Sequence, residues 1–180
     1  MKSRRYAPEF DATDRAILGL LQENCKRPLA AIGEKVGLSA PSVVERIHKL
    51  EEAGVIIGYV ALLDARKLGK DVSAFIGVNT DRPRAIGALE QQLVAIEDVL
   101  ECHHVTGVHT LLVKVKTENT EALEALIERI RALESVTRTE TIVVLSTHAE
   151  RSRIGLDVSE ELGTRPSRRG GSRGRGGRPR

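Results

Sequence analysis

Residues 28–57, PLAAIGEKVGLSAPSVVERIHKLEEAGVII, contain the pattern that decides the fold of the N-terminal part of this chain. Leu29, Ile32 and Val36 recur at the spacing that places apolar side chains on one face of a helix. Gly37 follows directly, and glycine is suited to the left-handed conformation that ends many helices. The pattern therefore predicts a short helix that stops in a tight turn.

A second helix is expected directly after that turn. Ser39 is a good N-cap, and Pro41 falls in the first helical turn, where its missing N–H is not needed. The buried stripe of this helix is expected to consist of Val43, Ile47 and Leu50. Successive helical residues are rotated by about 100°, so a second set of side chains points away from the stripe. These are Ser42, Glu45, His48 and Lys49. Two short helices around a tight turn predict a helix-turn-helix, whose second helix enters the major groove of DNA. We expect DNA contacts from Ser39, Pro41, Ser42, Glu45, Arg46 and Lys49.

The flanking sequence extends this module on both sides. Asp11 can cap an earlier helix through Ile17 and Leu20, and residues 55–59 predict a short β wing. Residues 10–64, FDATDRAILGLLQENCKRPLAAIGEKVGLSAPSVVERIHKLEEAGVIIGYVALLD, closely resemble the N-terminal domain of the Lrp/AsnC (leucine-responsive and asparagine-responsive) transcriptional regulators. The resemblance implies a winged helix-turn-helix domain over residues 1–60 that binds double-stranded DNA in a sequence-specific manner.

Residues 61–71 are expected to form a linker, and a second domain is expected over residues 72–150. Alternating apolar residues predict strands at 72–78, 99–106, 110–116 and 136–146. The spacing of apolar residues predicts one helix between the first two strands and another before the last strand. The order βαββαβ predicts a ferredoxin-like sandwich, so the whole chain is expected to belong to the α+β class.

Residues 100–119, LECHHVTGVHTLLVKVKTEN, resemble the most typical segment of the second domain of the same family. The resemblance implies that this domain forms homodimers, which assemble into tetramers or octamers, and that it binds a small effector, usually an amino acid, in the crevice between dimers. Many amino-acid-responsive members carry acidic residues where this chain has Val108 and Thr110. An amine buried without a counter-charge is costly, so this departure argues against ordinary amino-acid sensing. Loop amides and threonine hydroxyls can still hold a carboxylate or a neutral metabolite. The candidate effector residues are Thr106, Gly107, Val108, His109, Thr110, Thr139 and Thr141.

Other chemistry finds little support in the sequence. Cys102, His103, His104 and His109 lie close together in the chain, but neighbouring strand residues point to opposite faces and the spacing matches no established ligand pattern. We therefore expect no metal site. The chain has no phosphate-binding glycine motif, no dinucleotide fingerprint and no G-x-S-x-G nucleophile motif. These observations argue against an enzyme and against a cofactor.

The basic residues are concentrated at the C-terminal end. The net charge of the 180-residue chain is +3, but residues 164–180, TRPSRRGGSRGRGGRPR, hold seven Arg and no acidic residue. The 28 basic residues less these seven leave 21 against 25 acidic residues. We expect residues 151–180 to form a C-terminal extension whose Arg/Gly-rich part, residues 164–180, is disordered and binds phosphates.

This composition also supports an alternative, an architectural nucleoid or RNA-binding protein that uses the Arg/Gly-rich residues without responding to a ligand. With only two Tyr, two Phe and no Trp, however, the chain has few side chains on which single-stranded bases could stack. Two cysteines, no apolar signal sequence and no span-length apolar run predict a cytoplasmic, nucleoid-associated protein without a membrane partner.

Overall fold

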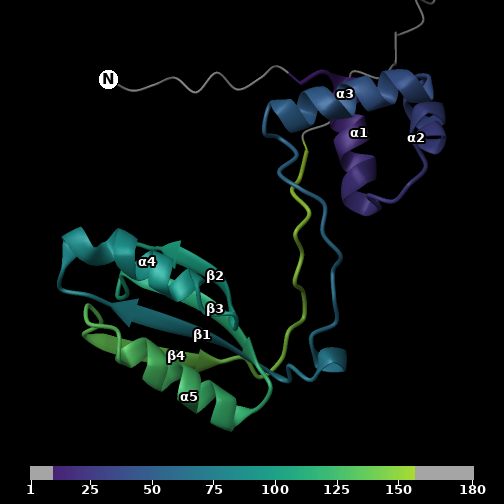
Figure 1. Cartoon of the computed structure of the whole chain (residues 1–180). Helices are drawn as coiled ribbons and strands as arrows, with labels where there is room; N and C mark the ends of the chain where they lie inside the picture. Colours follow the sequence, from purple (N-terminus) through teal and green to yellow (C-terminus); the bar gives the residue numbers. More distant parts are fainter. Residues whose placement is uncertain (1–9, 157–180) are drawn as a thin grey trace, which may run out of the picture. The chain divides into compact units, whose positions relative to one another are not determined.

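The computed structural model describes residues 10–156, which divide into two units (Figure 1). The first unit contains the described residues up to Val60 together with residues 152–156, and the second contains Ala61–Arg151. The expected fold class is confirmed: a helical N-terminal domain precedes an α+β domain with a four-stranded antiparallel sheet. None of the helices in the described residues is long and apolar enough to cross a membrane.

Three helices build the first unit: α1 (Ala12–Glu23), α2 (Leu29–Val36) and α3 (Ala40–Glu52). They enclose a small apolar core, which consists of Ile17, Ile32, Val43 and Ile47. The turn between α2 and α3 is tight because Gly37 adopts a left-handed conformation with φ 71°. A Cβ on Gly33 would also overlap the Leu38 carbonyl oxygen. The turn can therefore approach α2 this closely because residue 33 has no side chain.

The expected β wing is wrong for the described part of this chain. Residues 55–59 form no strand, and the side chain of Ile57 is 96% exposed. A strand needs a neighbour to accept and donate its backbone hydrogen bonds, and the structure pairs no other described segment with these residues. The N-terminal unit is therefore a three-helix helix-turn-helix without a wing strand.

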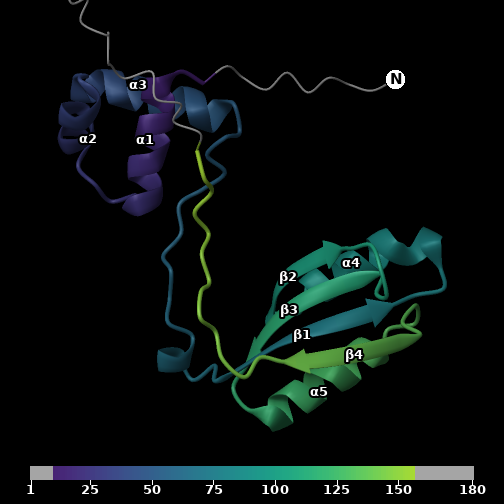
Figure 2. The same cartoon turned by 180° about the vertical axis from the view of Figure 1, so that it is seen from behind.

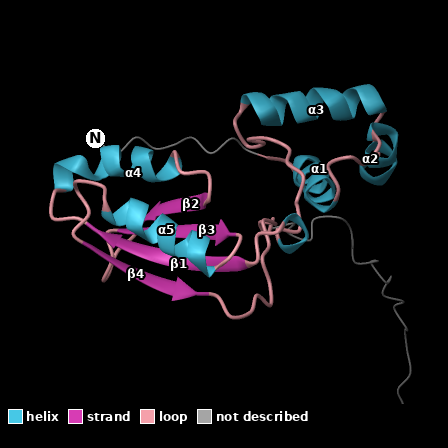
Figure 3. Ribbon diagram, turned by 60° about the horizontal axis from the view of Figure 1, so that its bottom comes forward, coloured by secondary structure: helices cyan, strands magenta, loops and turns pink. Residues whose placement is uncertain are grey.

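The second unit contains β1 (Val72–Asn79), α4 (Ile86–Val94), β2 (Val99–His104), β3 (Leu111–Thr117), α5 (Thr120–Arg131) and β4 (Arg138–Val143). Short 3-10 helices, at Arg66–Leu68 in the expected linker and at Pro83–Ala85 before α4, complete its described helices. The strands pair in the order β2-β3-β1-β4, and α4 and α5 cover the same face of the sheet (Figure 3).

Alternation along the strands separates the two faces of this sheet. Ala74, Ile76 and Val78 of β1 are fully buried in the core beneath the helices. Figure 2 shows the opposite face, with the strands in front of the helices. Leu100 of β2 and Ile142 of β4 are more than half exposed, so the sheet domain leaves apolar surface in contact with solvent.

Candidate DNA-binding surface and effector loop

Helix α3 presents the row of side chains that the sequence predicts for a DNA-reading helix. Ser39 caps the helix, and its Oγ accepts a hydrogen bond from the backbone N–H of Ser42 at 3.3 Å. Val43, Ile47 and Leu50 are buried, which fixes the rotation of the helix about its axis. The opposite side is open to solvent, with Pro41, Glu45, His48 and Lys49 exposed and Ser42 partly exposed.

Glu45 and Lys49 are paired with each other on this exposed side. The Lys49 Nζ donates to Glu45 Oε1 at 2.7 Å, one helical turn away. The hydrogen bond from Lys49, together with its charge, lowers the pKa of Glu45. The carboxylate is thus charged at neutral pH and competes with a DNA phosphate for the Lys49 ammonium.

Arg46 occupies a different environment from the one expected of a DNA contact. Its Nη1 donates to Asp11 Oδ2 at 2.8 Å and to Asp14 Oδ1 at 2.7 Å, and its side chain is only 32% exposed. Hydrogen bonds to Asp14 and Asp11 raise the pKa of Arg46. The pKa of Asp11 is lowered, chiefly by the backbone N–H of Asp14 and also by Arg46. Arg46 therefore joins α3 to the first turn of α1.

The loop between β2 and β3, residues 105–110, is held by a residue that sequence reasoning missed. Asn79, at the end of β1, donates from Nδ2 to the carbonyl oxygen of Val108 at 3.1 Å. Its Oδ1 accepts from the backbone N–H of Thr110 at 3.3 Å and lies 3.3 Å from His109 Nδ1. Gly107 has φ 116°, a conformation that L side chains rarely adopt. The loop therefore has a defined shape that depends on Asn79 and Gly107.

His109 lies over Gly77 and close to a carboxylate on the neighbouring strand. A Cβ on Gly77 would come within 2.5 Å of the His109 ring, so the imidazole occupies the space that a side chain would fill. Glu140 of β4 is opposite Gly77 in the sheet register, and its Oε2 lies 3.8 Å from His109 Nε2. Positions 108 and 110 carry no acid, but Glu140 supplies one from β4. Sequence spacing gave no signal for it, because the strand pairing brings it near the loop.

The structure groups only some of the candidate effector residues. Thr106, Gly107, Val108, His109 and Thr110 belong to one loop. Thr139 and Thr141 pair in register with Val78 and Ile76, whose side chains are buried beneath the helices. Thr139 Oγ1 accepts from Arg131 Nε of α5 at 2.8 Å, which places this hydroxyl on the helix-covered face. The structure therefore separates Thr139 and Thr141 from His109 and Glu140, because adjacent strand positions face opposite sides of the sheet.

The histidines near this loop do not gather into a ligand set. His103 Nε2 lies 3.1 Å from Glu101 Oε2, an ordinary surface pair. Within residues 10–156, no three His, Cys, Asp or Glu side chains come together as metal ligands would.

Two family models match the chain in the order of its two units. The AsnC-type helix-turn-helix domain matches residues 10–51, and the Lrp/AsnC ligand binding domain matches residues 73–154. The HTH-type transcriptional regulator FL11 of Pyrococcus abyssi is 33% identical over 147 residues, which cover 82% of this chain and 97% of the relative. The regulatory protein AsnC of Escherichia coli K12 is 31% identical over 141 residues, covering 76% of this chain and 90% of the relative.

Solved structures agree with these sequence matches. The structure of E. coli AsnC superposes with a TM-score of 0.75 at 28% identity and covers 81% of this chain and 98% of that one. A Neisseria meningitidis transcriptional regulator in complex with L-Met gives a TM-score of 0.79 at 25% identity, covering 83% and 98%. A feast or famine regulatory protein from Mycobacterium tuberculosis complexed with L-methionine gives a TM-score of 0.76 at 29% identity and covers 81% of this chain and 99% of that one. The chain belongs to the Lrp/AsnC family of DNA-binding transcriptional regulators.

Proposed function

We propose that α3 reads operator DNA in the major groove, with Ser42 and Glu45 at base edges and Lys49 at a phosphate. The observation that supports this assignment is the rotation of α3, because three buried residues turn exactly this row toward solvent. Ser39 and Pro41 lie at the N-terminal end of the helix, where backbone N–H groups can meet a phosphate. Arg46 is not among the proposed base contacts, because Asp14 of α1 and the N-cap residue Asp11 already bind its guanidinium.

The test compares operator binding by the wild-type chain with binding by Ser42→Ala and Lys49→Ala. Loss of a good base contact costs about 1–3 kcal/mol at one position of the site, so Ser42→Ala should relax the preference at that position. Lys49→Ala should weaken all duplexes evenly and reduce the salt dependence, since phosphate contacts carry no sequence information. If both variants bind the operator as the wild type does and remain folded, α3 is not the reading helix.

The second part of the proposal places the effector at the loop formed by residues 105–110. Two relatives of known structure are complexes with L-methionine, and this loop has a fixed shape with exposed Val108 beside polar groups. The ammonium group of an amino acid can donate hydrogen bonds to the Glu140 carboxylate, which is about half exposed. Thermal unfolding in the presence of L-methionine and of its keto acid separates an amine-requiring site from one that needs only a carboxylate. A shift with neither compound would remove this ligand class.

The third part of the proposal is self-association through the uncovered face of the sheet. Ile142 of β4 is more than half exposed and pairs in register with Phe75, whose neighbours Ala74 and Ile76 are buried beneath the helices. Ile142 therefore belongs to the uncovered face. A second copy that covers this face would remove the apolar surface from water. Light scattering after size exclusion measures the assembly, and Ile142→Lys should dissociate it. A monomeric wild-type protein would contradict this part.

A further inference from the structure

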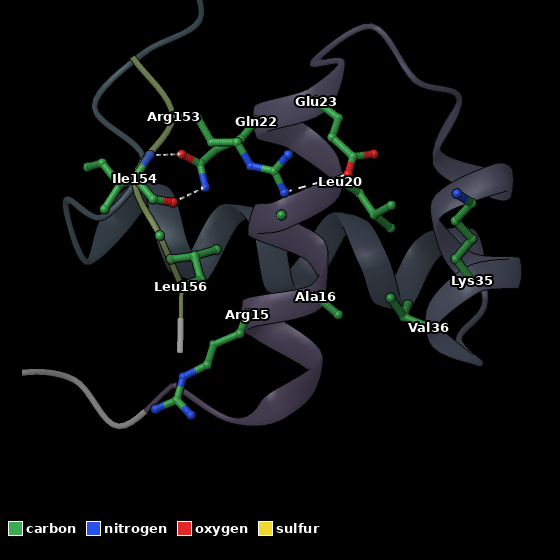
Figure 4. Close-up of a pocket in the computed structure, with 12 residues that line it drawn as sticks. Arg15, Ala16, Leu20, Gln22, Glu23, Lys35, Val36, Arg153, Ile154 and Leu156 are labelled. Atoms are coloured by element: carbon green, nitrogen blue, oxygen red, sulfur yellow. Dashed lines mark hydrogen bonds and ion pairs between the residues drawn. The ribbon is translucent and has the colours of Figure 1, made fainter. Parts of the chain in front are cut away.

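Residues 152–156 follow the sheet domain in sequence but pack in the unit that contains the helix-turn-helix. The side-chain amide of Gln22, on α1, pairs with the backbone of Ile154 in both directions (Figure 4). Gln22 Nε2 donates to the Ile154 carbonyl oxygen at 3.1 Å, and the Ile154 N–H donates to Gln22 Oε1 at 2.7 Å. One side chain thus makes the two hydrogen bonds that a neighbouring strand would make.

Further contacts on both sides of Ile154 hold the same segment. Arg153 Nη2 lies 3.6 Å from Glu23 Oε1, directly after Gln22 in α1. Leu156 is partly buried and borders a cleft of about 400 Å³ whose other apolar walls include Leu20 of α1 and Val36 of α2. The Ile154 side chain itself is 72% exposed, so the backbone pair with Gln22, not the Ile154 side chain, fixes the segment.

We call the contacts of residues 153–156 with Gln22, Glu23 and the cleft the anchor. Because of the anchor, the arginines that follow are attached to the unit that contains the helix-turn-helix. Residues 164–180 hold seven Arg and no acidic residue, and they lie beyond the last residue matched by the family models, 154. Residues 157–180, which include the segment expected to be disordered, lie outside the described residues. Arg165 follows Leu156 by nine positions, so the extended chain between them spans at most about 30 Å. Helix α3, with 13 residues, is about 20 Å long.

We propose that residues 153–156 fasten the Arg/Gly-rich residues 164–180 to the DNA-binding unit, so that these arginines bind phosphates that flank the site read by α3. The partner is duplex DNA already held by α3, and the inference therefore rests on the proposed function. Arginines neutralise phosphates without reading bases, so they add affinity and leave the sequence preference unchanged.

Complete release of residues 153–156, by loss of the Gln22, Glu23 and Leu156 contacts together, lengthens the tether. The next fixed residue upstream is Glu150, whose carboxylate pairs with Lys114 and with Lys116 of β3, in the other unit. Arg165 then lies fifteen positions, instead of nine, after the last fixed residue. Effective concentration falls with roughly the −3/2 power of tether length, so the local concentration of arginine at the DNA should fall about twofold or more.

A double-mutant cycle on the full-length chain tests the proposal. The four proteins are wild type, Gln22→Ala, a deletion of residues 164–180, and the combination of both changes. Binding to operator and to random duplex is measured at several salt concentrations. If half of the seven arginines contact phosphate, the deletion should lower the magnitude of the salt slope by about 3, since each contact contributes about 0.9. Gln22→Ala removes both hydrogen bonds to Ile154 and leaves the Arg153–Glu23 pair, so it should weaken binding by up to about twofold in the full-length chain and have no effect in the truncated chain.

Matched variants separate the anchor from general damage to the fold. Gln92→Ala changes an exposed glutamine on α4 and should leave DNA binding unaltered. Exchange of the Ile154 amide hydrogen measures the anchor without DNA: it should be slow in the wild type and fast in Gln22→Ala. Gln22→Glu keeps an acceptor for the Ile154 N–H but cannot donate to its carbonyl oxygen, so an intermediate rate is expected.

The outcomes are distinct. Equal losses from Gln22→Ala in the full-length and truncated chains would show a purely structural role and overturn the proposal. An unchanged salt slope after deletion would show that the arginines do not touch DNA, and a selective loss of single-stranded RNA binding would assign them to RNA instead. If no variant binds duplex DNA, the proposed function itself fails, whereas the exchange experiment would still report the anchor.

Discussion

Replacement of Arg46 by alanine should destabilise the N-terminal unit, although the residue lies on the helix expected to read DNA. The guanidinium donates to Asp11 and Asp14 at 2.8 and 2.7 Å, and these bonds join α3 to the start of α1. A hydrogen bond to a charged group contributes about 1.5–3 kcal/mol when well shielded. Because Arg46 is 32% and Asp11 52% exposed, solvent screening reduces this contribution. We expect a total loss of about 1–2 kcal/mol in the free energy of unfolding.

The assay is urea unfolding of the full-length protein followed by helical circular dichroism, with Lys49→Ala as the matched control. Among residues 10–156, Lys49 pairs only with Glu45, on the exposed side of the same helix, so its removal should leave the unfolding midpoint nearly unchanged. Arg46→Ala should lower the midpoint and should weaken DNA binding only as far as the folded fraction falls. A stable Arg46→Ala protein that has lost operator affinity would refute this reasoning and return Arg46 to the DNA interface.

The contact between Asp11 and Arg46 predicts that the stability of the N-terminal unit decreases at acidic pH. The folded-state pKa of Asp11 lies below the ordinary value of an aspartate, chiefly because the Asp14 N–H and also Arg46 stabilise the carboxylate. A carboxyl group with a lowered pKa stabilises the fold above its unfolded-state pKa, and this stabilisation is lost as the pH falls through the folded-state pKa. The free energy of unfolding should therefore fall less steeply with decreasing pH, near and below pH 4, in Arg46→Ala than in the wild type. The share of this pH dependence that comes from the hydrogen bond between the Asp14 N–H and Asp11 should remain in the variant.

Three further results are expected. Glu45→Gln should tighten binding to random duplex at low salt, because it removes a negative charge near phosphate and frees Lys49; unchanged affinity in a fluorescence anisotropy titration would contradict this. Gly107→Ala should lower the thermal stability of the sheet domain, and Asn79→Ala should accelerate amide exchange in residues 105–110, because both changes disturb the same loop. Wild-type behaviour in both variants would show that Gly107 and Asn79 do not hold this loop. The pKa of the Tyr59 phenol is raised to about 12, first by burial and then by Glu51. Absorbance near 295 nm should therefore show one tyrosine that ionises at about this pH. A tyrosine titration that is complete near pH 10 would contradict the raised pKa.

Sequence reasoning worked best where local rules decide the structure. Ser39 and Gly37 delimit α3 and α2 as expected, because capping and left-handed turns depend on residues close in the chain. The apolar alternation likewise predicted a strand at 72–78, and β1 spans Val72–Asn79.

The errors and omissions concern partners that are distant in sequence. Residues 55–59 look like a strand, but a strand requires a paired neighbour, which no local pattern can supply. Arg46 has the charge of a phosphate ligand, yet Asp11 and Asp14, 35 and 32 positions away, bind it instead. Gln22 and Ile154 are 132 positions apart, and a backbone hydrogen bond to a glutamine leaves no trace in hydrophobic spacing.

The central claim is that α3 reads a defined DNA sequence through its exposed row of side chains. Selection of binding sites from a randomised duplex library, carried out in parallel with wild-type protein and with Ser42→Ala, tests this claim most directly. We expect one enriched motif for the wild type and, for the variant, a motif that loses information at a defined position on each half-site. Identical motifs from the two proteins, or no enriched motif from the wild type, would contradict it.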